Sequence, residues 1–387
     1  MGNERGAESS SLLSLHVVGA GIGESIILQI PHESRPGRFH WGVVDCYSAS
    51  KDPWKNPTLR FLRSKKDLGA CRLDFACVTH PHDDHLFGFW HLFASDDVVV
   101  EKFWRFPADD WTLLRAFRGL SGDFALHAEY PRLERELSNL LKYTKKHRKS
   151  DDPSRYRRCL DYNKAVYRRL IHTIDSGNDV LLEISSLAPS SKQLDNHADR
   201  LAACLGDEES PRKRLFDPTR YDREIHNLLS VVLLVRFGDT HIILGADAEC
   251  DSWIDILGNS DREEDGVHLS CDVIKVSHHG SVDAFHQPAW EEHAARRPPV
   301  VIITPYQRGS SRLPDSVMRE RFAGCASEVH VTSELAEIGR VRKAFKSNFL
   351  RRKILRHVAG SSLPVHGKTV RVDHMGHVLR VDDLTIE

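Results

Sequence analysis

The chain has 387 residues, and its 54 Lys and Arg residues against 55 Asp and Glu give a formal net charge of -1. Hydrophobic residues make up 40% and charged residues 28%, which is typical of soluble globular proteins, and this charge balance excludes any argument for a nucleic-acid or membrane partner from net charge alone. No apolar run approaches the roughly 20 residues of a membrane helix, and the N-terminal residues MGNERGAESSS lack the apolar core of a signal peptide. Eight scattered cysteines without a CxxC pair predict buried thiols in a reducing compartment, so we expect a cytoplasmic protein that does not contact a membrane.

The first predicted elements are three strands, LSLHVVG, SIILQIP and WGVVDCY, at residues 13–19, 25–31 and 41–47. Glycines 19, 21 and 23 separate the first two, but Glu24 stands where a dinucleotide-binding G-x-G-x-x-G motif needs its third glycine, and the following residues are rich in β-formers. We therefore expect an antiparallel β start to the domain, with no nucleotide site.

Helical spacing dominates between residues 100 and 178. PRLERELSNLLKYTKKH, residues 131–147, carries leucines at 133, 137, 140 and 141 on one helical face, and a second helix is expected from the Asp152 cap to the Gly177 stop. Because the strand-like DVLLEISSLAP follows at once, we interpret 100–178 as a helical insertion within a single domain over 12–387. A polar helix and loop are expected over 191–226, and a helix followed by a hairpin, TVRVD-HMG-HVLRV, forms a C-terminal extension over 335–387.

Three other apolar strands end in side chains that bind metals. DFACVT ends at His80, THIILGA ends at Asp247 after a hairpin with VVLLVRF across Gly238-Asp239, and CDVIKVS ends at His278 and His279. Loops at the ends of strands carry functional sites on rigid scaffolds. We therefore expect these three loops to converge.

The segment CVTHPHDDHLFG, residues 77–88, has the densest set of ligand-type residues. His80 and His82 lie two apart on extended backbone and face the same side, whereas Asp84 and His85 fall in the first turn of a helix and point elsewhere. One short segment can thereby serve two adjacent metal positions, and imidazole with carboxylate suits Zn²⁺, Mn²⁺ or Fe.

A dinuclear site needs ligands from elsewhere, and His226, Asp247, His278 and His279 stand at suitable places. Two alternatives remain at this stage: His226 can be a hydrogen-bonded structural histidine, and Asp247 can be a turn residue after its strand. Two metals roughly 3.5–4 Å apart would activate a water molecule and clamp the oxygens of a phosphoester or acyl substrate.

THPHDDH matches the HxHxDH signature of the metallo-β-lactamase superfamily, and the order of segments resembles the branch that includes the hydrolase domain of the DNA-uptake channel ComEC. The resemblance covers VGAGIGESIILQIP, WGVVD, LLEISSLAPS, SVVLLVRFGDTHIILGADAE and DVIKVSHHGS as well. It implies an α/β (α+β) fold, an αββα sandwich with two metals at one edge between two sheets.

The resemblance also implies an assignment of ligands. These are His80 and His82 for one metal, Asp84 and His85 for the other, and Asp247 as the bridge. His278 or His279 closes the second metal, with His278 preferred as the first residue after the strand, and His226 matches the third motif by its spacing ahead of a strand.

Two basic stretches bear on the substrate: residues 142–172 have 11 Lys or Arg against three acids, and residues 340–356 have eight against none. Each can be a solvated helix face, but together they suggest binding of nucleic acid or another phosphorylated substrate. The leading hypothesis is a metal-dependent hydrolase, a phosphodiesterase or nuclease using metal-activated water, with Zn²⁺ or Mn²⁺ and catalytic roles for Asp84 and Asp247 as ligands. The alternatives are hydrolysis of a small ester, lactone or lactam, and a non-enzymatic module of a defence or DNA-handling system.

Overall fold

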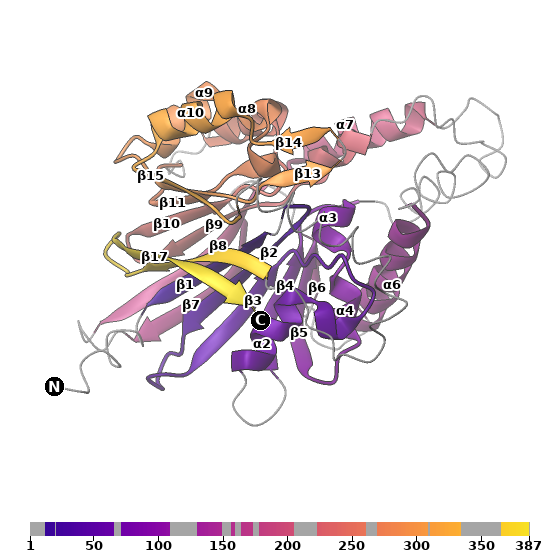
Figure 1. Ribbon diagram of the computed structural model, residues 1–387, viewed down its shortest axis with the longest axis horizontal. Coiled ribbons are helices and arrows are strands. Elements are labelled where there is room, and N and C mark those ends of the chain that lie inside the picture. The colour runs from indigo at the N-terminus through magenta and orange to yellow at the C-terminus, as the bar shows by residue number, and fades with distance from the viewer. Residues whose placement is uncertain are drawn as a thin grey trace, which may run out of the picture.

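The computed structural model describes residues 12–19, 21–65, 71–108, 130–148, 156–158, 164–172, 178–204, 223–260, 269–308, 310–333 and 365–386. Two large sheets form the centre of this part of the chain (Figure 1). The first has eight strands in the order β17 (Val378–Ile386), β16 (Val365–Val372), β1 (Leu13–Gly19), β2 (Glu24–Pro31), β3 (Phe39–Val44), β4 (Cys71–Val78), β5 (Val98–Arg105) and β6 (Tyr156–Arg158). The second has seven, in the order β15 (Glu328–Val331), β12 (Val300–Ile303), β11 (Val273–Lys275), β10 (Thr240–Leu244), β9 (Val232–Phe237), β8 (Asp179–Ala188) and β7 (Lys164–His172).

Helices cover the outer faces of both sheets. Figure 1 shows α2 (Pro57–Lys65), α4 (Phe89–Phe93) and α6 (Tyr130–Arg148) on the side of the first sheet, and α8 (Cys250–Ser260), α9 (Gln287–His293) and α10 (Ser316–Cys325) on the side of the second. The short α3 (Asp83–Leu86) and the helix α7 (Ser191–Ala203) lie nearer one end, together with a separate two-stranded hairpin of β13 (Tyr306–Arg308) and β14 (Ser311–Leu313).

The strands of the second sheet are apolar on both faces because each face packs against a different layer. Along β9, Leu233, Val235 and Phe237 belong to the core between the sheets, whereas Val232 and Leu234 belong to a second core that includes residues of α8, α9 and α10. Successive side chains of a strand point to opposite faces, so a continuous apolar run is what a two-sided strand requires. The layers are helix, sheet, sheet and helix, and the expected αββα sandwich is confirmed.

Most elements predicted from sequence patterns are present. β1, β2 and β3 pair antiparallel in chain order, β9 and β10 form the expected hairpin, and β16 and β17 form the C-terminal hairpin, which adds to the first sheet at β1. The leucine face of α6 is buried at Leu133, Leu137 and Leu140. The helix predicted after residue 335 lies outside the described residues, and so does the loop predicted after α7 as far as residue 222; residues 223–226 begin a 3-10 helix.

The second helix predicted between Asp152 and Gly177 is wrong. The described residues there form the strands β6 and β7, and β7 pairs antiparallel with β8 along its length. Tyr167 and Ile171 are buried on one face of β7, whereas Leu170 is 59% exposed on the other face, so an apolar residue on the outer face gave the segment its helix-like spacing. Among the described residues of 100–178, α6 is therefore the helical part, and β5, β6 and β7 extend the two sheets; the division of the chain into one domain with an insertion stays a prediction.

Two further expectations concern membrane-spanning segments and the state of the cysteines. In the part of the chain that the structure describes, no helix combines the length and apolarity that a membrane span requires. The cysteines there form no disulfide with one another, and Cys46, Cys71, Cys77, Cys204 and Cys271 are buried.

The low pKa values of three buried histidines predict that the protein loses stability in mild acid. Burial lowers the pKa of His16, His197 and His293 from 6.5 to about 4. In the unfolded chain each of these histidines binds a proton near pH 6.5, but in the folded chain it does so only near pH 4. The stabilisation that the neutral histidines provide is therefore complete above pH 6.5 and is lost as the pH falls toward 4. Each histidine contributes up to about 3 kcal/mol. We expect the urea midpoint to fall steadily from pH 7 to pH 4.5 and the decline to be shallower in His293→Gln; an unchanged midpoint over this range would contradict the prediction.

Candidate metal centre

Loops that follow three strands meet at one edge of the sandwich. Among the described residues, four groups of ligand-type atoms have all their atoms within 4.8 Å of one another, and two of these groups, both buried, share Asp247. The first group contains His80, His82 and Asp247, and the second contains Asp84, His85, His279 and Asp247. His80 and His82 follow β4, Asp84 and His85 lie in α3, Asp247 follows β10, and His279 follows β11. We call these six residues the metal cluster, and Asp247 belongs to both of its groups.

Hydrogen bonds at Nδ1 orient three of the histidines. The pairs are His80 with Thr79 Oγ1 at 3.0 Å, His85 with Asp45 Oδ2 at 2.7 Å, and His279 with the Thr304 carbonyl at 2.9 Å. An imidazole that donates through Nδ1 presents the lone pair of Nε2 on its other side. This arrangement is the one that proteins use to fix the tautomer and direction of a metal-binding histidine.

Several buried atoms of the cluster have no hydrogen-bond partner. They are Nε2 of His80, Nε2 of His85 and Oδ1 of Asp247. His85 Nε2 lies 3.1 Å from Asp247 Oδ1, and His80 Nε2 lies 3.4 Å from Asp247 Oδ2, but neither contact has hydrogen-bond geometry. Buried polar atoms rarely lack a partner, and converging imidazole and carboxylate lone pairs suit divalent cations. The cluster therefore fits a dinuclear metal site.

The cluster is strongly coupled electrostatically. Burial disfavours charge at His85, but the carboxylates of Asp247 and Asp45 outweigh it and raise the pKa of His85 well above 6.5. Burial likewise opposes ionisation of Asp247, but His85 and His80 lower the pKa of its carboxyl well below 3.8. Burial lowers the pKa of His80. A metal ion at this place competes with protons, because its ligands bind in their deprotonated forms.

Unusual backbone geometry surrounds the same place. The non-glycine residues with positive φ in the described chain are Asp45, Ala246, His278 and His279, at 56°, 46°, 45° and 54°. Each of these residues belongs to the cluster, adjoins a residue of it, or hydrogen-bonds to one. This conformation costs an L-residue about 1–3 kcal/mol and is concentrated at functional sites.

Of the two adjacent histidines, the structure places His279 in the cluster and not the preferred His278. His279 Nε2 lies 3.2 Å from Asp84 Oδ2 inside the cluster. His278 lies outside both groups, with Nδ1 3.2 Å from Glu249 Oε1 and 3.1 Å from Ser281 Oγ. The strand β11 ends already at Lys275, and the left-handed turn that follows rotates the second histidine inward. Being first after the apolar run therefore did not decide which histidine faces the cluster.

His226 lies next to the cluster without joining it. It belongs to a 3-10 helix, η4 (Arg223–Leu229), and is fully buried. Its ring centroid is 6.0 Å from that of His82, and its Nδ1 lies 3.0 Å from His197 Nε2. Neither ligand group includes it, so its role as a ligand stays a prediction.

Sequence reasoning assigned no role to two carboxylates behind the cluster. Asp45, one residue after β3, accepts hydrogen bonds from His85 Nδ1 and from the backbone and hydroxyl of Thr79. Glu24 lies against His85 and is paired with Lys275 and the hydroxyl of Thr304. The rule that singled out His80, a polar residue directly after an apolar strand, applies equally to Asp45 in WGVVD.

The Lys275–Glu24 ion pair should be essential for stability. Both side chains are fully buried, and removing one partner of such a pair costs about 3–5 kcal/mol because a charge stays buried without its counterion. We expect Lys275→Met to lower the free energy of unfolding by this amount in urea at pH 7. The matched control is Lys368→Met, which breaks a pair with the exposed Asp383 and should cost less than about 1 kcal/mol. Equal losses in the two variants would refute the role of burial.

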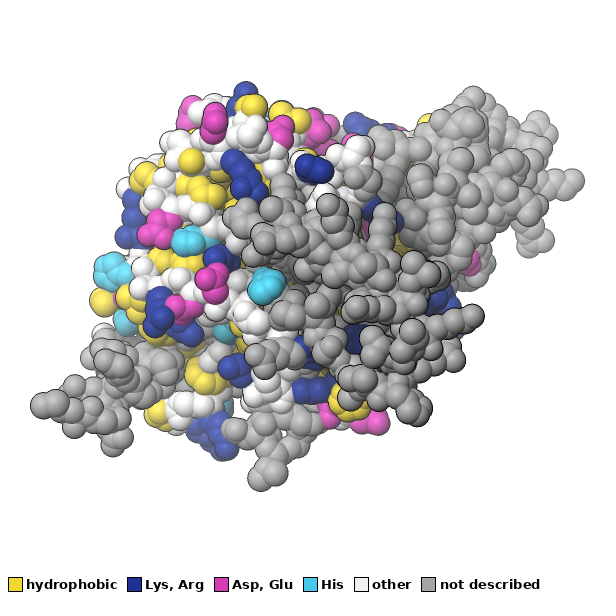
Figure 2. Space-filling model, viewed as in Figure 1, with side chains coloured by type: hydrophobic (Ala, Val, Ile, Leu, Met, Phe, Trp, Pro, Cys, Tyr) yellow, Lys and Arg dark blue, Asp and Glu magenta, His cyan; other side chains and the backbone are white. Residues whose placement is uncertain are grey.

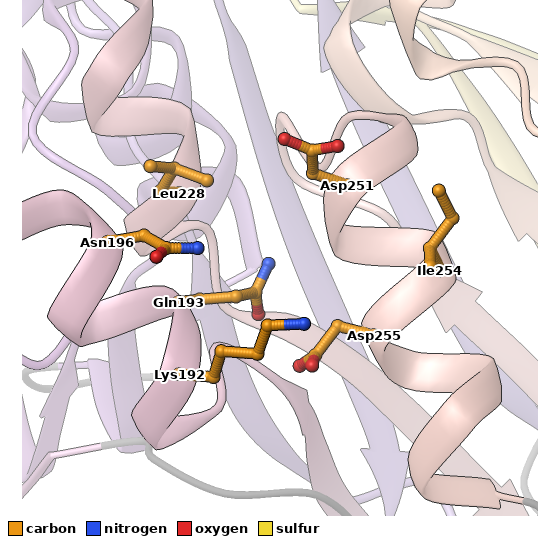
Figure 3. A pocket seen from close by; sticks show the side chains of 7 residues that line it. All are labelled: Lys192, Gln193, Asn196, Leu228, Asp251, Ile254 and Asp255. Atoms are coloured by element: carbon orange, nitrogen blue, oxygen red, sulfur yellow. The ribbon is translucent and has the colours of Figure 1, made fainter.

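A cavity of about 180 Å³ lies elsewhere, between α7 and α8 (Figure 3). Lys192, Gln193 and Asn196 face Asp251 and Asp255 across it, and Leu228 and Ile254 also line it. None of these residues belongs to the metal cluster. The cavity is thus separate from the chemistry that the cluster can support.

Two arginines of the basic stretch 142–172 pair with acidic side chains. Arg168 pairs with Glu183, and Arg169 pairs with Glu33 at 3.0 Å and with Asp74 at 2.7 Å. On the face shown in Figure 2, described Lys and Arg side chains are dispersed among Asp, Glu and His side chains. The second basic stretch, 340–356, lies outside the described residues.

Comparisons with known proteins give limited information. No protein-family model and no curated protein matches the sequence. Among solved structures, the chain matches a mutant of the CmlA beta-hydroxylase at 13% sequence identity and a TM-score of 0.37, over 83% of this chain and 52% of that one. This chain thus spans about half the length of that protein. The resemblance to the ComEC branch rests on the sequence motifs and stays a prediction.

Proposed function

We propose that this protein is a metal-dependent hydrolase that cleaves phosphodiesters, as a phosphodiesterase or nuclease, with two divalent cations, Zn²⁺ or Mn²⁺. The observation that carries the proposal is the position of Asp247 in both ligand groups of a buried cluster. Two cations held in this way supply Lewis acidity and lower the pKa of water to about 7.

The protein's own residues prepare the site. Asp247 joins the two ligand groups, and Asp45, Thr79 and Thr304 fix the directions of the histidine rings. His80, His85 and Asp247 are at most 2% exposed, so water does not compete for their lone pairs. Ligands held in place in this way need no reorganisation during the reaction.

A small ester, lactone or lactam is the second candidate substrate. The observation in its favour is that Arg168 and Arg169, in the stretch expected to attract nucleic acid, are paired with acidic side chains. Both candidate functions use the same metal cluster, so they are distinguished only by which substrate is hydrolysed.

Substrate assays of the full chain loaded with Mn²⁺ or Zn²⁺ distinguish the two. We expect cleavage of single-stranded DNA, double-stranded DNA or RNA, and of bis(p-nitrophenyl) phosphate, each abolished in His80→Ala. Hydrolysis of p-nitrophenyl acetate or a lactone without any phosphodiester cleavage would establish the second candidate instead. Metal content measured on the same samples verifies that the preparation was loaded.

A further inference from the structure

The β13–β14 hairpin belongs to neither large sheet, and it begins two residues beyond Thr304, whose carbonyl holds His279. Figure 1 shows the hairpin apart from the two large sheets and near α3, the helix that carries Asp84 and His85. Its strands pair antiparallel, with Gln307 opposite Arg312. Alternate residues of a strand point to opposite faces, so Tyr306 and Arg308 share one face of the hairpin, while Gln307 and Arg312 share the other.

The face with Tyr306 and Arg308 meets the metal cluster. The Tyr306 ring stacks on His279, with centroids 5.1 Å apart and an interplanar angle of 29°. Arg308 Nη1 lies 2.8 Å from Oδ2 of Asp83, the neighbour of Asp84 in α3. A backbone hydrogen bond of 2.7 Å from Gln307 N to Gly21 O anchors the hairpin to the glycine turn before β2. Three separate contacts thus hold the hairpin in place.

Tyr47 links Arg308 electrostatically to the cluster. Burial raises the pKa of its phenol, the charges of Asp83 and Asp84 raise it further, and Arg132 and Arg308 oppose them. The Arg308 guanidinium and the Asp84 carboxylate therefore act on the same hydroxyl group. The Tyr47 ring also packs so closely on Gly23 that a Cβ there would lie 2.4 Å from it, so the glycine turn supports this wall of the site.

We propose that Arg308, held on the inner face of the β13–β14 hairpin and supported by Tyr306, binds the phosphate oxyanion of the substrate beside the metal cluster. A guanidinium matches phosphate oxygens with a planar fork of donors. The Arg308 side chain is 34% exposed, so a ligand can reach it, and its pairing with Asp83 limits the freedom that binding must remove. The inference rests on the proposed function and assigns it a recognition residue.

The alternative is that Arg308 only ties the hairpin to α3. A partly exposed ion pair contributes about 0–1 kcal/mol to stability, so Arg308→Ala should fold in either case. The experiment must therefore measure recognition of an anion. Arg312→Ala supplies the matched control, because it removes a guanidinium from the opposite face of the same hairpin.

The test compares wild type, Arg308→Ala, Arg308→Lys and Arg312→Ala, all loaded with metal. We expect Arg308→Ala to lower the ratio of kcat/KM for bis(p-nitrophenyl) phosphate to kcat/KM for neutral p-nitrophenyl acetate about tenfold, and to weaken inorganic phosphate binding in calorimetry by a similar factor. Arg308→Lys keeps the positive charge but loses the planar fork of donors, so its kcat/KM ratio and phosphate affinity should lie between those of wild type and Arg308→Ala. Arg312→Ala should match wild type in both.

The outcomes separate this inference from the proposed function. If wild type cleaves the diester and Arg308→Ala changes neither the ratio nor phosphate binding, the recognition role is refuted and the proposed function stands. If phosphate binding depends on Arg308 but wild type cleaves no phosphodiester, the anion site is supported and the proposed function fails. If Arg308→Ala loses metal or affects both substrates equally, Arg308 is structural and the inference is overturned.

Discussion

Replacing Asp247 with asparagine is expected to reduce kcat/KM for phosphodiester cleavage by at least about a thousandfold, equivalent to roughly 4 kcal/mol of transition-state stabilisation. Asp247 is the residue that both ligand groups share, and its two oxygens face different histidines: Oδ1 faces His85 and Oδ2 faces His80. A neutral amide keeps the shape of the side chain but loses the charge and one of the two oxygen donors. We therefore expect the metal content also to fall below two ions per chain.

The measurement combines steady-state kinetics with metal analysis on the same samples. Asp239→Asn is the matched control, because Asp239 is an exposed aspartate in the turn at the other end of the same β9–β10 hairpin. It should keep wild-type activity and metal content. An Asp247→Asn protein with two ions and undiminished turnover would show that the shared carboxylate does not hold the centre together.

The second large effect distinguishes two adjacent histidines. His279→Ala should lose one of the two metal ions and at least about a hundredfold in activity, more than the 10–100-fold typical of residues that only orient a ligand. His278→Ala removes a side chain that contacts Glu249 and Ser281 outside the cluster, and we expect less than a tenfold change. Each variant is the control for the other, since both replace an imidazole in the same left-handed turn. The reverse order of effects would identify His278 as the ligand.

The spacing of apolar residues along the sequence predicted most of the fold. Apolar runs predicted β4, β9, β10 and β11, and the leucine spacing predicted α6. The pattern was misleading at β7, because the apolar Leu170 is exposed and because pairing with β8, a contact with another segment, decided the conformation. The sequence was limited in the same way at the metal centre. The residue types identified the segments that form it, but they did not identify every side chain that points inward.

The sequence by itself determined the chemistry available, because imidazoles and carboxylates are concentrated in THPHDDH and repeated at the ends of two later strands. This set of ligands predicts a dinuclear site, and the expectation of a sandwich came from the resemblance to a known family. Only the tertiary structure decided that His279 faces Asp84, that Asp45 and Glu24 lie behind His85, and that Arg308 reaches Asp83. The physical reason is that these partners are far apart along the chain, 195 residues for His279 and Asp84 and 225 for Arg308 and Asp83. Which side chain points inward at such a meeting depends on backbone torsions in the connecting turns and on the packing of both sheets, and no local pattern of residues encodes either.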